Sequence, residues 1–175
     1  MESRPQIFAC VGPESTGKTT LCRQLASRFE GTVVPEFARQ YLTSKGGNYQ
    51  QKELITIAEG QLTLETQAIS DGHEWIFCDT DLLVVKVWHE FKYGASNDEI
   101  DSLLLKQQSR KYLLTYPDLD WESDPLRENP NDLFEIFTYY ENELIEMGAD
   151  YRIVRGIGDE RLKSAIEAIN QMKLD

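Results

Sequence analysis

Short apolar runs alternate along this chain with longer stretches in which an apolar residue recurs every three or four positions. The runs at 7–11, 32–36, 75–79, 112–116 and 151–154 have the length and composition of buried strands. The longer stretches predict helices over 18–29, 54–70, 82–93, 99–110, 130–144 and 162–169. Strands that alternate with helices predict an α/β fold, a five-stranded parallel sheet with helices on both faces.

Residues 117–130, "PDLDWESDPLRENP", do not follow either pattern. The stretch has three prolines, many acidic residues and a single arginine, Arg127, with no apolar period. Little burial would hold such a segment in one place, so we expect a lid over the edge of the sheet. On closure, Arg127 could neutralise charge on a ligand. Trp121 could close over a flat ligand or anchor the segment to the body.

Composition narrows the range of functions. A chain of 175 residues predicts a single domain spanning 1–175. The net charge of −12 argues against nucleic-acid binding, and no apolar run is long enough to predict a membrane span or signal peptide. Cys10, Cys22 and Cys78 lie in apolar segments, which favours buried reduced thiols in a cytoplasmic protein.

The first strand runs directly into "GPESTGKT", which matches G-x-x-x-x-G-K-[ST] at every fixed position. Such a loop turns successive backbone N–H groups toward a phosphate, and the helix that follows adds the positive end of its dipole. Lys18 would reach the β- and γ-phosphates of ATP, and the Thr19 hydroxyl would ligate Mg²⁺. The predicted ATP-binding residues are Gly12, Pro13, Glu14, Ser15, Thr16, Gly17, Lys18, Thr19 and Thr20.

Carboxylates stand at the ends of the next two predicted strands, 32–36 and 75–79. Asp79 has the position of a second Mg²⁺ anchor, and Asp81 is either a helix cap or part of the site. Glu36 could orient an acceptor hydroxyl and accept its proton, or it could form only a surface pair with Arg39. Arg39 would face the same way if a helix starts here. Asp79 and Asp81 are the other candidates for the base. Because the carboxyl ends of parallel strands share one edge, these groups are expected to converge there.

The 12–19 motif, the carboxylates at the strand ends and the lid together favour a small-molecule kinase among the classes of nucleotide-binding protein. No guanine-reading "NKxD" is present, and the chain leaves no room for the sensor elements of a ring-forming motor. A lid that excludes water would direct the phosphoryl group to an acceptor.

Four blocks, "GPESTGKTTL", "VPEFARQYL", "FCDTDLLVVKVWHEFKYG" and "YLLTYPDLDWESDPLRENP", together resemble the ribosylnicotinamide kinase domain of NadR-type proteins. The resemblance extends to their stand-alone relatives, which are often labelled only as ATPases, and it covers nearly the whole chain. It implies the P-loop NTPase fold and phosphorylation of the 5′-hydroxyl of nicotinamide riboside with ATP and Mg²⁺, which gives nicotinamide mononucleotide for NAD synthesis.

By this resemblance the E-x-x-R, D-T-D and W-x-x-D-x-L-R blocks supply the rest of the site. The catalytic residues would be Lys18, Glu36, Asp79 and Arg127, with Thr19 and Asp79 on the metal. A cationic pyridinium ring would favour an acidic or aromatic pocket. The predicted substrate-binding residues are Glu36, Arg39, Asp81, Trp88, Tyr93, Trp121 and Asp124.

Some expectations depart from NadR or stay open. NadR also carries an adenylyltransferase domain and often a DNA-binding segment, and neither activity is expected of this sequence. The loop 155–160 is the predicted adenine site by topology. The alternatives to nicotinamide riboside kinase are another nucleoside or metabolite kinase, and a regulatory ATPase without an acceptor.

Overall fold

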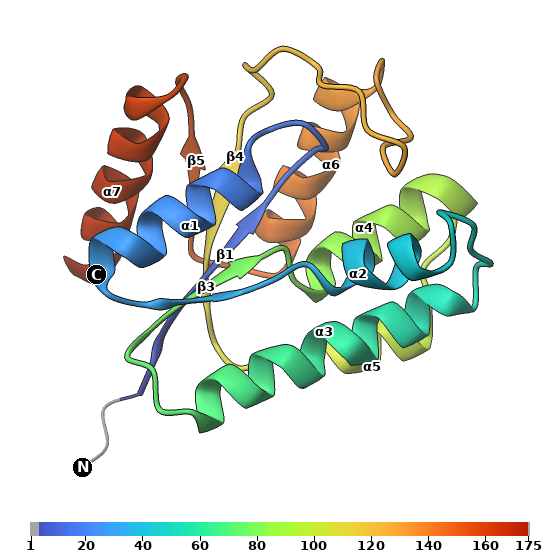
Figure 1. Ribbon diagram of the computed structural model, residues 1–175, viewed down its shortest axis with the longest axis horizontal. Helices are drawn as coiled ribbons and strands as arrows, with labels where there is room; N and C mark the ends of the chain where they lie inside the picture. The colour runs from blue at the N-terminus through green and yellow to red at the C-terminus, as the bar shows by residue number, and fades with distance from the viewer. Residues whose placement is uncertain (1–3, 175) are drawn as a thin grey trace.

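The computed structural model describes residues 4–174 and has a central parallel sheet covered by helices on both faces (Figure 1). The strand order is β2-β3-β1-β4-β5. The strands are β1 (Gln6–Val11), β2 (Thr32–Val34), β3 (Trp75–Asp79), β4 (Lys111–Thr115) and β5 (Tyr151–Val154). The helices are α1 (Lys18–Phe29), α2 (Phe37–Ser44), α3 (Glu53–Ser70), α4 (Leu82–Tyr93), α5 (Asp98–Leu104), α6 (Leu133–Glu146) and α7 (Asp159–Leu174).

Alternate residues of the central strand β1 point into two different cores. Ile7, Ala9 and Val11 pack with apolar residues of α3, α4 and α6. Phe8 and Cys10 pack on the opposite face with α1 and α7. Because β1 is buried on both sides, its sequence is a continuous apolar run and not an alternating one. Helices α2 and α5 lie outside these layers and form a third cluster with α3 and α4.

The predicted fold class is confirmed, and several element bounds differ from the prediction; α7, for example, runs over Asp159–Leu174 and not only over 162–169. Strand β2 ends at Val34, so Glu36 lies at the N-cap position of α2. Helix α5 ends at Leu104, six residues earlier than expected. Helix α6 begins at Leu133, three residues after the expected Pro130.

Two further expectations concern the whole chain. The three cysteines are free and buried, as predicted. Within residues 4–174, none of the helices combines the length and apolarity that crossing a bilayer requires.

Candidate active site

The loop of residues 12–19 joins β1 to α1 at the carboxyl edge of the sheet, and β4 fixes its shape. Gly12 has φ +136°, and a Cβ there would lie 2.6 Å from Thr115 Oγ1 and 2.8 Å from the Thr115 carbonyl oxygen. Thr16 Oγ1 lies 2.8 Å from the carbonyl oxygen of Pro13 and 2.6 Å from Thr115 Oγ1. The loop is therefore held against the end of β4, and only glycine fits at its first position.

Lys18 is the basic group of this loop. Its Nζ donates to the carbonyl oxygens of Gly12 (2.9 Å) and Pro13 (2.6 Å). Burial lowers the pKa of Lys18, whereas the charges of Glu36, Asp79 and Glu14 act in the opposite direction. The charges of three carboxylates thus act on the ammonium group at the edge where β1, β2 and β3 end.

Asp79 and Thr19 have the chemistry that Mg²⁺ requires. Asp79 is the last residue of β3 and is 4% exposed. Its Oδ1 is buried and has no hydrogen-bond partner among the described residues. Thr19 and Asp79 both line the same cavity. Within residues 4–174, no group of three or more His, Cys, Asp or Glu is placed to hold a metal. These two oxygen ligands therefore fit an ion that is also bound by a nucleotide's phosphates.

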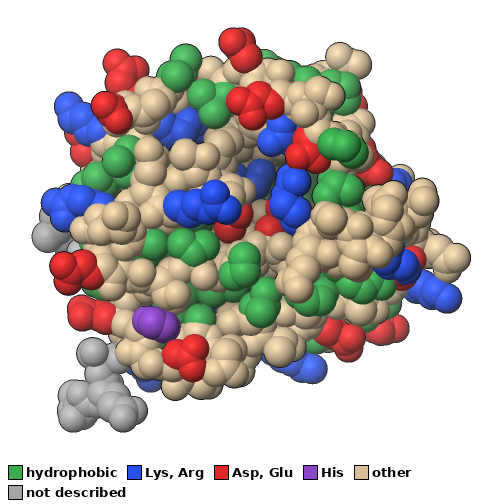
Figure 2. Space-filling model, in the orientation of Figure 1, with side chains coloured by type: hydrophobic (Ala, Val, Ile, Leu, Met, Phe, Trp, Pro, Cys, Tyr) green, Lys and Arg blue, Asp and Glu red, His purple; other side chains and the backbone are tan. Residues whose placement is uncertain are grey.

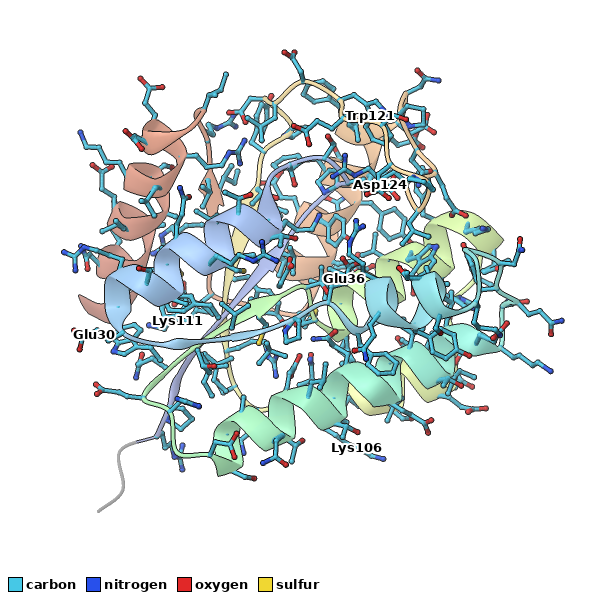
Figure 3. The ribbon with its side chains drawn as sticks, in the orientation of Figure 1. Glu30, Glu36, Lys106, Lys111, Trp121 and Asp124 are labelled. Atoms are coloured by element: carbon cyan, nitrogen blue, oxygen red, sulfur yellow. The ribbon has the colours of Figure 1, made fainter. Side chains whose placement is uncertain are left out.

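Glu36 and Arg39 face each other one turn apart at the start of α2. Arg39 Nε lies 3.8 Å from Glu36 Oε2, the arrangement expected from their spacing. Burial raises the pKa of Glu36, and the charge of Lys18 opposes that shift. Arg39 Nη1 also contacts Asp124 Oδ2 at 3.0 Å. Arg39 therefore connects the tip of β2 to the 117–130 segment, where Figure 3 shows Asp124 and Trp121 above Glu36.

The 117–130 segment is hydrogen-bonded directly to the loop of residues 12–19, here called the phosphate loop. Ser15 Oγ donates to the Asp120 carbonyl oxygen (3.3 Å) and accepts from the Glu122 N–H (2.8 Å). Arg127 Nη1 lies 3.4 Å from Ser15 Oγ and also donates to the carbonyl oxygen of Glu122. In this position Arg127 lies at the loop that carries Lys18.

The carboxylate of Glu14 makes a second connection between the same two segments. It accepts hydrogen bonds from the backbone N–H groups of Glu128 (3.1 Å) and Asn129 (3.0 Å). The phosphate loop thus holds the segment at two points along its length.

A cavity of about 880 Å³ begins at the phosphate loop and extends along α4 and beneath the 117–130 segment. Figure 2 shows a hollow on this face of the molecule with both basic and acidic side chains around it. Residues 12–20, Glu36, Arg39, Asp79 and Arg127 all line the cavity. Its α4 side consists of Val84, Val87, Trp88 and Phe91, followed by Lys92.

Four of the predicted substrate-binding residues are not on the cavity wall. Tyr93 packs against His89, with ring centroids 5.2 Å apart. Trp121 is half-buried and its ring lies 5.9 Å from the Arg127 guanidinium. Asp124 accepts from the Leu126 N–H (2.9 Å) in addition to its contact with Arg39. Trp121 and Asp124 therefore contact the arginines of the site, and they do not face its interior.

The fourth residue, Asp81, lies in a buried network behind the site. It is 0% exposed, and its Oδ1 accepts from the Leu83 N–H (3.0 Å), so it caps α4. Its Oδ2 lies 3.6 Å from Arg110 Nη1. Arg110 Nη2 pairs with Glu65 of α3 at 2.8 Å. The structure thus supports the capping interpretation of Asp81.

Arg161, Lys92 and Glu128 line the cavity and were not predicted from the sequence. Arg161 of α7 is 4% exposed, pairs with Asp118, and has Nε and Nη1 atoms that make no hydrogen bond within the described residues. Ile157 and Gly158, from the loop predicted to hold adenine, line the cavity too. Lys92 and Glu128 both contact Tyr49. The sequence signal for Arg161 and Lys92 is a charged residue beside an apolar helical stripe, and Glu128 has no such signal.

Comparisons with known proteins identify the family and the fold. A family model described as an AAA domain matches residues 7–161. The chain is 25% identical, over 95% of its length, to the trifunctional NAD biosynthesis/regulator protein NadR of Escherichia coli. It covers 42% of that relative, so it spans less than half of the NadR sequence it matches.

Two solved structures share the fold. A NadR protein in complex with NR superposes with a TM-score of 0.81 at 20% identity, over 96% of this chain and 50% of that one. A thymidylate kinase from Ehrlichia chaffeensis superposes with a TM-score of 0.68 at 14% identity, over 97% and 100% of the two chains. At these identities the likeness concerns the fold, which is that of P-loop kinases.

Proposed function

The chain belongs to the family of the AAA-domain model and is similar to the kinase part of NadR, and from this premise we propose that it is a nicotinamide riboside kinase. The reaction transfers the γ-phosphoryl group of ATP to the 5′-hydroxyl of the riboside and gives nicotinamide mononucleotide. The resemblance of the four sequence blocks to NadR-type kinase domains and the NadR structure in complex with NR support this acceptor.

One observation carries the proposal: a single cavity joins the phosphate loop to Glu36 and to an aromatic wall. An ATP-binding loop alone would suit any nucleotide hydrolase. Here the wall continues along α4 past Trp88 and Phe91, which gives a flat aromatic acceptor a surface next to the phosphate loop. A cation held over such a ring gains further attraction from the π face.

Each residue at the edge of the sheet has a role in this reaction. Glu36 accepts the proton of the acceptor hydroxyl as the oxygen attacks phosphorus, and its raised pKa makes it a stronger base. Lys18 and Arg127 neutralise charge on the transferred group. Thr19 and Asp79 would hold Mg²⁺, which supplies charge neutralisation at the phosphates.

The 117–130 segment acts as the lid of this site. Its bonds to Ser15 and Glu14 bring Arg127 to the phosphate loop and cover the space above it. Closure excludes water, so the phosphoryl group passes to the alcohol and not to water.

The direct test is product formation. The protein is incubated with ATP, Mg²⁺ and nicotinamide riboside, and the mononucleotide is measured by chromatography and mass spectrometry, with Lys18→Ala as the inactive control. Formation of the mononucleotide by the wild-type protein alone supports the proposal. Absence of product at high enzyme concentration contradicts it.

A panel of other nucleosides tests the acceptor independently of the chemistry. The thymidylate kinase likeness makes nucleosides and nucleotides the appropriate competitors. We expect kcat/KM to be highest for nicotinamide riboside. A higher value for another member of the panel would leave a kinase but contradict this acceptor.

A further inference from the structure

A polar cluster lies on the cavity wall at the C-terminal part of α4. It consists of Tyr49, from the connection between α2 and α3, Lys92 of α4, and Glu128 of the 117–130 segment. Lys92 lies eight residues beyond Val84, so its Cα is about 12 Å farther along α4 than that of Val84. Lys92 and Glu128 both line the cavity, next to the ring of Trp88.

The three side chains are fully connected to one another. Lys92 Nζ contacts Glu128 Oε1 at 2.9 Å and Oε2 at 3.1 Å, and it also donates to the Tyr49 hydroxyl. The Tyr49 hydroxyl donates to Glu128 Oε2 at 3.0 Å and accepts from Trp88 Nε1 at 2.9 Å. Trp88, the aromatic surface of the wall, is thereby fixed to the cluster.

The cluster contains one positive and one negative charge, so its net charge is zero. Burial works to lower the pKa of Lys92, but the hydrogen bonds to Tyr49 and Glu128 raise it overall, and the side chain stays charged. Burial raises the pKa of Tyr49 to about 12, so the hydroxyl stays neutral. The cluster itself therefore offers both donors and acceptors but no surplus charge to balance an ionised substituent.

We propose that Tyr49, Lys92 and Glu128 determine acceptor specificity by favouring a ring with a neutral hydrogen-bonding substituent over the same ring with a carboxylate. A carboxamide needs one acceptor and one donor, and the Lys92–Glu128 pair supplies both when one of the two Lys92–Glu128 hydrogen bonds is exchanged for the ligand. A carboxylate would leave Glu128 facing a like charge and would compete with it for Lys92. This inference deepens the proposed function and rests on it.

The test compares nicotinamide riboside with nicotinic acid riboside, which differ only in this substituent. The quantity measured is the ratio of their kcat/KM values, amide over acid. The wild-type ratio should exceed one. Glu128→Gln leaves an unpaired positive charge and should lower the ratio about threefold to tenfold, whereas Lys92→Met leaves an unpaired negative charge and should raise it by a similar factor.

The opposite changes of the kcat/KM ratio expected in the two variants distinguish selection by charge from a structural role. A loss of stability or of ATP binding changes kcat/KM for both ribosides equally and leaves their ratio constant. Lys92 and Glu128 are 37% and 38% exposed, so both shifts should also shrink as salt is raised. Lys45→Met and Glu59→Gln remove the same charges outside the cavity wall, and they should leave the ratio at the wild-type value.

The outcomes of this test are distinct. Opposite shifts in the two variants support the assignment. Shifts in the same direction, no shift, or a wild-type ratio below one would overturn it while leaving the kinase activity in place. If the wild-type protein phosphorylates neither riboside, the proposed function itself fails.

Discussion

Removal of the Arg110 side chain should destabilise the protein strongly and in a pH-dependent way. Its Nη2 lies 2.8 Å from Glu65 Oε2 and its Nη1 lies 3.6 Å from Asp81 Oδ2. The side chains of Arg110 and Glu65 are 3% exposed and that of Asp81 is fully buried. Arg110→Met would keep much of the packing volume but leave two buried carboxylates without their cation.

The expected loss follows from that burial. Breaking a buried ion pair from one side costs about 3–5 kcal/mol, because the remaining charge has no compensating partner. Two carboxylates share this arginine, so we expect the upper part of that range at pH 8. Because Asp81 caps α4, whose side chains line the cavity, the variant should also lose kinase activity at temperatures where it is still folded.

The pKa values of Glu65 and Asp81 determine whether the stability of the variant rises or falls with pH. Burial raises the pKa of Glu65 to about 7 even though the Arg110 charge opposes the shift. Burial raises the pKa of Asp81 as well, again against Arg110. Without Arg110 both folded-state values rise further above the unfolded values. The folded variant then binds more protons than the unfolded chain, so its stability falls as pH rises through this window.

Urea unfolding at pH 5.5 and pH 8, followed by tryptophan fluorescence, measures both effects. We expect the loss relative to wild type to be smaller at pH 5.5 by about 1–2 kcal/mol, because protonation neutralises the orphaned carboxyls there. Adding Glu65→Gln to Arg110→Met should recover part of the loss at pH 8. A loss below about 1 kcal/mol at pH 8, or equal losses at both pH values, would refute this reasoning.

Three further predictions concern the site. Glu36→Gln should lower kcat about 10²- to 10⁴-fold with little change in the KM for ATP. In the wild-type protein kcat should fall as the pH drops through the raised pKa of Glu36, and this fall should be absent in the variant. A defect confined to ATP binding would remove Glu36 from the acceptor site. Arg127→Ala should lower kcat about 10²- to 10³-fold in steady-state assays, and unchanged turnover would contradict the lid assignment. Gly12→Ala should raise the calorimetric Kd for ATP at least about tenfold, because the new methyl group would lie 2.6 Å from Thr115 Oγ1, and an unchanged Kd would contradict that steric argument.

The parts of the fold and site that depend on local sequence could be predicted. Continuous apolar runs identify the buried strands of a parallel sheet, and the motif at 12–19 fixes the nucleotide loop between a strand and a helix. Since all these strands run parallel, Glu36 and Asp79 were expected at one edge, and both line the cavity there. Their chemical roles remain proposals.

The parts that depend on contacts between distant segments could not be predicted. The apolar spacing of 99–110 is compatible with one helix, but α5 ends at Leu104 and the chain then brings Arg110 to its two carboxylates. Asp81 follows a strand just as a site residue would, and only Arg110 shows that it faces away from the cavity. Lys92 and Glu128 are 36 residues apart, and nothing in their local sequence indicates that they pair.

The most direct test of the central claim is whether each ATP consumed yields one phosphorylated riboside. ADP, inorganic phosphate and nicotinamide mononucleotide are followed together in a time course with ATP and Mg²⁺, with and without nicotinamide riboside. A site that closes over an acceptor alcohol predicts ADP and mononucleotide in equal amounts, with little phosphate when the riboside is left out. Phosphate release at the same rate in both reactions, without mononucleotide, would instead indicate a nucleotide hydrolase.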